Sequence, residues 1–289
     1  MMIFDATIKD LLNKKLSQLE TKFKSDVTFY LGEIQPALLR LFRDLIEDLK
    51  KDKKSKESLV IILNTTGGSA EIAEKMVDIT RKHYEEVYFI VPDFAMSAGT
   101  LFCMSGDKIY MDYSSSLGPI DPQVWNGKQW VPALGYLNKV EDFLKKDRLG
   151  TLTRAEFLIL QAQDLAMLSQ CEQAKELTIT LLKKWLVEYK FKDWTKHESN
   201  PDKKGQPVTK QEKEKRAEEI ATLLGDNTTW HSHGRMIGIE TLRKELKLKI
   251  EDFSEDSVLH SLIRSYNDLL TEYIARNNFS LFLHSRKLF

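Results

Sequence analysis

The strongest constraint on the fold is a pair of continuous apolar runs, Leu59–Leu63 (LVIIL) and Val87–Val91 (VYFIV), with a helical pattern between them. A run without alternation suits a strand that is buried on both faces of a sheet. Between the runs, Gly67-Gly68 breaks the chain, and apolar residues then recur at three- and four-residue steps from Ile72 to Thr80. A strand, a turn, a helix and a second strand in this order form the βαβ unit of a parallel sheet. The sequence therefore predicts an α/β fold.

The regions on either side of this unit show the same kinds of pattern. Further strands are predicted at Val27–Leu31 and Lys108–Met111. Asn126-Gly127 is a dipeptide typical of the two-residue turn in a β-hairpin. The spacing of apolar residues predicts helices at Pro36–Leu49, Ala98–Met104, Ile239–Leu246 and Asp256–Arg276, and a mostly helical region over Val140–Lys192.

These patterns divide the chain into three regions. Residues 1–25 are predicted to form an amphipathic helix, residues 26–250 the main domain, and residues 251–289 a helical C-terminal extension. Within the domain, residues 195–216 contain Pro, Gly and an excess of basic over acidic side chains, which predicts a mobile polar loop. We expect this loop to gate the cleft. Apolar residues near the C-terminus, Phe279 and Leu281–Leu283, need cover, which favours self-association.

Composition limits the classes of partner. Lys and Arg total 43, as do Asp and Glu, so the balance of charge favours neither nucleic acid nor an acidic membrane surface. The N-terminal segment mixes charged and apolar residues, and no stretch has the roughly 18 to 20 apolar residues of a signal-anchor or membrane-spanning helix. The two cysteines, Cys103 and Cys171, lie in apolar helical contexts. We therefore expect free thiols, no membrane anchor and a cytoplasmic location.

The most informative serine lies in Asp93-Phe-Ala-Met-Ser97-Ala-Gly99-Thr, between a predicted strand and a predicted helix. This position exposes the hydroxyl at the carboxyl edge of a parallel sheet, where ligands of α/β proteins bind. The amides at the start of the following helix favour a negative charge nearby. Ser97 is therefore a candidate nucleophile, although a serine at such a place often only caps the helix.

A second turn at the same edge presents backbone amides. Asn64-Thr-Thr-Gly67-Gly68 also follows a predicted strand and precedes a helix. Adjacent glycines allow the backbone to turn tightly and to expose its N–H groups. The amide of Ala98 together with that of Gly67 or Gly68 therefore makes a plausible oxyanion hole.

Four segments occur in order along the chain: Thr66-Gly-Gly, Val91-Pro with Ala95-Met-Ser-Ala-Gly-Thr-Leu101, Gly106-Asp-Lys-Ile-Tyr-Met-Asp112, and Ser116-Leu-Gly-Pro-Ile-Asp-Pro-Gln123. Together they resemble the serine dehydrogenase proteinase family, a relative of ClpP and signal peptide peptidase A in the ClpP/crotonase-like superfamily. The resemblance covers about residues 60–124 and returns near 230–246. It implies a spiral of ββα units, hydrolysis of a peptide or protein substrate without metal or nucleotide cofactor, and a homo-oligomer.

The resemblance also implies a catalytic triad in the chain order Ser, Asp, His. Where ClpP relatives have the histidine, this chain has Asp121, between Pro119 and Pro122. Where ClpP has its aspartate, the chain reads Trp-His-Ser-His233-Gly-Arg. A triad needs only an imidazole between serine and carboxylate, whatever the order in the chain. We therefore predict Ser97, Asp121 and His233 as the triad, with His231 as an alternative to His233.

Several alternatives stay open. Lys139 is a rival base, because relatives of signal peptide peptidase A use a Ser/Lys pair and burial can keep a lysine neutral. A crotonase-type acyl-CoA enzyme would share the fold, and an inactive scaffold would keep it without chemistry. Thr66 stands where relatives commonly have proline, so the turn before the glycine pair has a freer φ angle.

Overall fold

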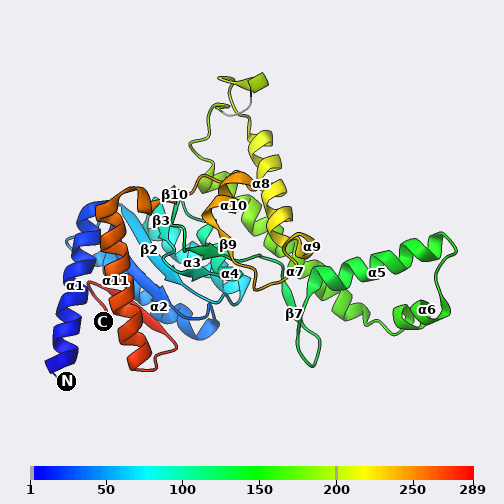
Figure 1. Cartoon of the computed structure of the whole chain (residues 1–289), viewed down its shortest axis with the longest axis horizontal. Helices are drawn as coiled ribbons and strands as arrows, with labels where there is room; N and C mark the ends of the chain where they lie inside the picture. Colours follow the sequence, from blue (N-terminus) through cyan, green and yellow to red (C-terminus); the bar gives the residue numbers. More distant parts are fainter. Residues whose placement is uncertain (1–2, 199–200) are drawn as a thin grey trace.

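A six-stranded sheet forms the core of the body of the molecule in the computed structural model, which describes residues 3–198 and 201–289 (Figure 1). In spatial order the strands are β10 (Glu251–Asp252), β5 (Lys108–Met111), β3 (Glu86–Ile90), β2 (Ser58–Asn64), β1 (Asp26–Leu31) and β11 (Phe282–Ser285). The first five are parallel, and β11 is antiparallel to β1. The predicted α/β class and its parallel sheet are confirmed.

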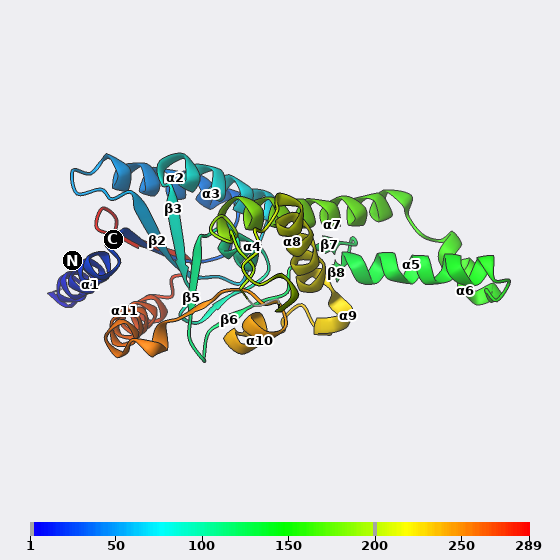
Figure 2. The same ribbon diagram turned by 90° about the horizontal axis from the view of Figure 1, so that it is seen from above.

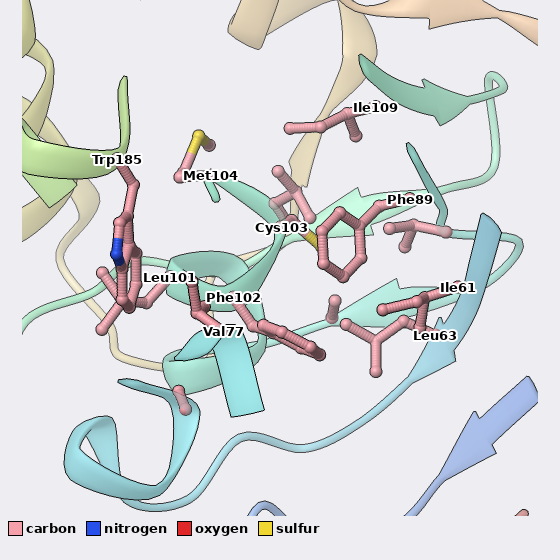
Figure 3. Close-up of a cluster of buried hydrophobic side chains, with 14 of the residues drawn as sticks. Ile61, Leu63, Val77, Phe89, Leu101, Phe102, Cys103, Met104, Ile109 and Trp185 are labelled. Atoms are coloured by element: carbon pink, nitrogen blue, oxygen red, sulfur yellow. The ribbon is translucent and has the colours of Figure 1, made fainter. Parts of the chain in front are cut away.

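Helices cover both faces of this sheet (Figure 2). One face carries α2 (Pro36–Lys51), α3 (Ala70–His83) and α4 (Ala98–Cys103), and the other carries α1 (Ile3–Phe23) and α11 (Ser257–Arg276). The side chains of β2 alternate between the two resulting cores. Ile61 and Leu63 face the first core, near Phe89 in Figure 3, whereas Val60 and Ile62 face the second. Burial on both sides explains why this strand is apolar at every position from Leu59 to Leu63.

A smaller sheet stands at the carboxyl ends of the parallel strands. It consists of β4 (Phe94–Ala95), β6 (Ser116–Leu117) and β9 (Ile237–Gly238), and Thr65 extends it through a bridge to Ala95. Strand β3 thus continues into β4 before α4, and β2 continues into the bridge at Thr65 before α3. This repeated strand–strand–helix unit agrees with the predicted ββα spiral.

An arm of helices extends away from the body (Figures 1 and 2). The predicted helical region over Val140–Lys192 is divided there into separate helices, since the chain turns at Gly150 with a φ angle of 67°. The arm comprises α5 (Ala133–Arg148), α6 (Arg154–Gln161) and α7 (Leu165–Trp185), which continues as the π-helical turn Leu186–Lys190. The remaining helices are α8 (Lys210–Gly225), α9 (Asn227–Trp230) and α10 (Ile239–Lys244), with 3₁₀ turns at Pro201–Lys203 and Phe253–Glu255.

The predicted hairpin precedes this arm, but its turn is longer than two residues. Strands β7 (Gln123–Trp125) and β8 (Trp130–Pro132) pair with Trp125 opposite Trp130, which leaves four residues in the turn. Asn126 Oδ1 accepts hydrogen bonds from the amides of Lys128 and Gln129 at 3.0 and 2.9 Å. The Asn side chain therefore stabilises a wider turn than its dipeptide signature predicts.

The C-terminal extension is helical in α11, as predicted, and also adds a strand to the main sheet. Strand β11 pairs with β1 in the register Thr28↔Ser285. Leu283 is buried in the first core, and Phe282 packs against the second. Most of the C-terminal apolar run is thus covered by its own chain, so this run no longer argues for self-association.

The predicted polar loop is shorter than expected. Helix α8 begins at Lys210, because Thr209 Oγ1 accepts from the amide of Glu212 while the Glu212 side chain accepts from the Thr209 amide. Residues 210–216 are therefore helical. Residues 199–200 of the loop, and residues 1–2 of the N-terminal helix, lie outside the described residues; the mobility of the loop stays a prediction.

Candidate active site

Ser97 lies at the turn between β4 and α4 in a strained backbone conformation, with φ 50° and ψ −115°. Such a conformation costs about 1–3 kcal/mol in a residue with a side chain and persists only where neighbouring structure imposes it. Hydrogen bonds on both sides do so here: the Met96 amide donates to Thr65 O at 3.0 Å, and the Leu101 amide donates to Ser97 O at 3.1 Å. The Ser97 side chain is half-buried and lines a pocket of about 1030 Å³.

The glycine turn after β2 lies directly against this serine. A Cβ atom on Gly67 would lie 2.9 Å from Ser97 Cβ, so only glycine permits this approach. The Gly67 amide donates to Thr65 Oγ1 at 3.1 Å and is buried. Gly68 is exposed at the pocket, and within the described ranges neither its amide nor that of Ala98 donates to a protein acceptor. Of the three predicted oxyanion donors, Gly68 and Ala98 are therefore available, whereas Gly67 is occupied.

The register of the small sheet brings Asp121 and His233 together. Strands β6 and β9 are antiparallel and pair Leu117 with Ile237. Asp121 follows Leu117 by four residues, and His233 precedes Ile237 by four, so the two side chains lie opposite each other beyond the paired ends. The distance between His233 Nδ1 and Asp121 Oδ1 is 2.8 Å.

Asp121 is held from several sides. Its side chain is 2% exposed, against 33% for His233, and Gln123 Nε2 donates to its second oxygen, Oδ2, at 2.9 Å. The neighbouring Ile120 amide donates to Leu224 O at 3.0 Å, which fixes the loop to the end of α8. An ionised carboxylate can only accept, so a neutral His233 carries its proton on Nδ1 and presents Nε2 as an acceptor.

Ser97 and His233 line the same pocket, but the described residues contain no hydrogen bond between them. Such hydrogen bonds often shorten only when substrate is bound. The pocket thus holds a strained serine, two unpaired amides and a carboxylate-bound imidazole.

The alternative bases lie elsewhere. His231 is exposed at the end of α9, with a left-handed φ of 61°. Lys139 lies on α5, is 64% exposed, and pairs with Asp142 Oδ2 at 3.7 Å; it is not among the residues that line the pocket. The structure therefore brings neither of them to Ser97.

Sequence patterns did not identify Gln123 or the two tryptophans of the β7–β8 hairpin as pocket residues. Gln123 supports Asp121, and Trp125 and Trp130 stack edge to face at 5.8 Å on the pocket wall. The turn dipeptide predicted the hairpin, but nothing local to these residues indicates what they face. The residues that line the pocket also include the apolar side chains of Leu101, Ile120, Val124, Ala174 and Leu177.

Comparisons with known proteins show the family of the chain. Residues 54–202 match the family described as ClpP-like SDH-type serine proteinase. Because this match covers just over half of the 289 residues, the chain belongs to the ClpP-like SDH-type serine proteinase family. The family resemblance and the ClpP-like fold expected from the sequence are thereby confirmed.

Two relatives are uncharacterized proteins of Methanocaldococcus jannaschii, 42% identical over 64 residues and 33% identical over 87 residues. These segments make up 22% and 30% of this chain, and only 22% and 27% of the relatives.

Two similar solved structures are of the 1510-N membrane-bound stomatin-specific protease, and one of them contains a substrate peptide. Their sequences are 14% and 16% identical to this chain, and each has a TM-score of 0.46. Each covers 78% of this chain, and the matches span 77% and 73% of those chains. The ClpP protease catalytic domain from Plasmodium falciparum is 17% identical, with a TM-score of 0.29, and the match covers 34% of this chain and 56% of that one. In residues 3–198 and 201–289 of the present chain, no helix is long and apolar enough to cross a bilayer.

Proposed function

We propose that the chain is a serine endopeptidase that forms an acyl-enzyme on Ser97. The observation that carries this proposal is one pocket lined by a strained serine and by a histidine whose Nδ1 lies 2.8 Å from a buried carboxylate. Membership of a serine proteinase family supports the same reaction class.

In the proposed reaction, His233 Nε2 takes the proton of Ser97 Oγ as that oxygen attacks the carbonyl carbon of a peptide. Asp121 keeps the Nδ1 proton in place and stabilises the imidazolium that forms. The amides of Gly68 and Ala98 donate to the oxyanion. His233 then gives its proton to the leaving amine. In the second half of the reaction, His233 takes a proton from water as the water attacks the acyl-enzyme, and then returns that proton to Ser97 Oγ.

The pocket fits an extended peptide as substrate. Its volume of about 1030 Å³ exceeds what a single side chain occupies, and several of its lining residues are apolar. The exposed tryptophan pair of the β7–β8 hairpin, which also lines the pocket, provides a further apolar contact surface. Room for several residues of a substrate favours cleavage within a chain over removal of a terminal residue.

Two broader features belong to the same proposal. Cys103 and Cys171 are both free and buried, which supports a reducing compartment such as the cytoplasm. Exposed apolar side chains on the helical arm support a homo-oligomer.

The test is covalent labelling with a fluorophosphonate, followed by mass spectrometry of the modified peptide. We expect the adduct on Ser97, and we expect Ser97→Ala to lose both labelling and peptide hydrolysis while melting at nearly the wild-type temperature. A wild-type protein that takes no label and hydrolyses no peptide would instead fit an acyl-CoA enzyme of this fold or an inactive scaffold.

A further inference from the structure

Asn267, a buried residue on α11, contacts the two segments that lead into the turns of the candidate active site. Its side chain is 1% exposed. Its Oδ1 accepts from Asn64 Nδ2 at 2.9 Å, and its Nδ2 donates to Asp93 Oδ2 at 2.8 Å. Asn64 ends β2, and Asp93 follows β3. One residue of the C-terminal helix thus joins the ends of two neighbouring strands.

These residues lie where the chain leads into the two turns that carry the proposed chemistry. Asn64 directly precedes the turn that presents the Gly68 amide, and Asp93 directly precedes β4, the two-residue strand that ends at the turn with Ser97 and the Ala98 amide. The turns also bond directly to each other, since the Thr65 amide donates to Phe94 O at 3.1 Å. A shift of one strand end relative to the other would therefore move one oxyanion donor relative to the nucleophile.

The remaining contacts of Asp93 and α11 make this connection rigid. Arg264 Nη1 lies 3.3 Å from Asp93 Oδ1, and its Nη2 lies 2.6 Å from Asp112 Oδ2 at the end of β5. Asp112 is fully buried. The same helix therefore holds the carboxyl ends of β2, β3 and β5 through one connected polar network.

We propose that Asn267 is a positioning residue that sets the relative placement of the two oxyanion amides, Gly68 and Ala98, about Ser97. This inference rests on the proposed function. The amide is required because one side of Asn267 must accept and the other must donate to a carboxylate. An aspartate at this place would still accept from Asn64, but it would set a second carboxylate against Asp93.

The test is a paired exchange of polar groups. Asn267→Asp should lower the limiting rate of Ser97 labelling by a fluorophosphonate about 10- to 100-fold, because small misplacements of groups in an active site lower reaction rates on this scale. The probe concentration that gives half of the limiting rate should change little. Adding Asp93→Asn should restore the rate. The amide nitrogen introduced at position 93 would then donate to the carboxylate introduced at position 267, while the amide oxygen would still accept from Arg264.

Tyr266→Phe is the matched control. It removes a buried hydrogen bond of the neighbouring residue on the same helix, to His284 Nδ1 at 2.7 Å, without touching either turn. We expect it to lower the melting temperature but to leave the labelling rate unchanged. A wild-type labelling rate in Asn267→Asp, or a double variant no faster than that single one, would overturn the proposal.

Hydrogen exchange separates this proposal from the proposed function. If the wild-type protein takes no label, the serine-peptidase proposal fails, but exchange in residues 64–68 and 93–98 still reports on the two turns. Faster exchange there in Asn267→Asp, recovered in the double variant, would support the positioning role. Unchanged protection in both variants would contradict it.

Discussion

At the scale of single residues, His284 shows how a buried ionisable group is kept neutral. It is fully buried in β11, with Nδ1 2.7 Å from the Tyr266 hydroxyl and Nε2 3.1 Å from Asn13 Oδ1. A neutral imidazole satisfies both partners by accepting from the hydroxyl and donating to the amide oxygen. Burial, together with the positive charge of Lys9, lowers the pKa of His284 from its ordinary value of 6.5 to about 4.

This lowered pKa predicts a loss of stability in mild acid. The unfolded chain binds a proton near pH 6.5, whereas the folded chain binds it only near pH 4, so unfolding takes up a proton between these values. The free energy of unfolding should therefore fall by about 3 kcal/mol as the pH drops through this window. Urea denaturation at several pH values measures it.

Two variants are matched. His284→Gln removes the titrating group, whereas Ser285→Ala weakens the same strand and keeps the imidazole of His284. We expect the first to reduce the dependence on pH between 6.5 and 4 and the second to keep it. A wild-type slope in His284→Gln would show that another group is responsible.

Residue patterns located only part of the candidate site. Ser97 and Gly68 could be predicted because a strand–turn–helix order and a glycine pair are local signals. Asp121 and His233 could be predicted only from the family resemblance. They lie 112 residues apart in the sequence, and their contact depends on the pairing of two distant strands. Gln123 and Asn267 could not be predicted at all, because a polar side chain with distant partners looks like any other in the sequence.

At the scale of elements, the β7–β8 hairpin is the part of the pocket most open to testing. Trp125 and Trp130 are 49% and 65% exposed and line the pocket. Exposed aromatic rings are typical of contact surfaces. We therefore expect Trp130→Ala to raise KM for a casein-derived peptide about 10-fold, equivalent to roughly 1.4 kcal/mol, with kcat little changed.

The contrast between kinetic constants distinguishes binding from damage to the site. Trp194→Ala is a suitable control, because Trp194 contacts Phe191 edge to face and is not among the residues that line the pocket. A fall in kcat with unchanged KM in Trp130→Ala would contradict the binding role of the hairpin.

Element prediction from the sequence succeeded where periodicity is strong and failed where an element needs a distant partner. The apolar run in β2 and the amphipathic pattern of α3 are sufficient to identify them. Strand β11 has four residues and forms only because β1 offers an edge. The predicted loop over residues 195–216 extends into α8 because the first residues of this helix are mostly charged, whereas the capping pair Thr209 and Glu212 sets the boundary at Lys210.

At the scale of the whole molecule, the helical arm leaves an apolar surface uncovered. We call this surface the arm tip; each of its side chains is more than half exposed, and they are Leu149, Phe157, Leu158, Ile159 and Leu165. Nothing in α6 is buried. Clustered apolar side chains at the end of a projecting element usually mark an interaction surface.

We expect the arm tip to contact a second copy of the chain. Light scattering should give a multiple of 33.5 kDa for the wild-type protein and about the monomer mass for Phe157→Asp combined with Ile159→Asp. Circular dichroism would check that the double variant stays folded. A wild-type mass of 33.5 kDa at every working concentration would contradict self-association.

The central claim is that His233, held by Asp121, is the base that activates Ser97. The most direct measurement is the rate of peptide hydrolysis by His233→Ala and Lys139→Ala beside the wild-type enzyme. We predict that His233→Ala lowers the rate of hydrolysis on the order of 10⁶-fold, about as much as Ser97→Ala, because triad members act as a unit. Lys139→Ala should keep the wild-type rate. An active His233→Ala enzyme together with an inactive Lys139→Ala enzyme would contradict this account and would assign the reaction to a Ser/Lys pair.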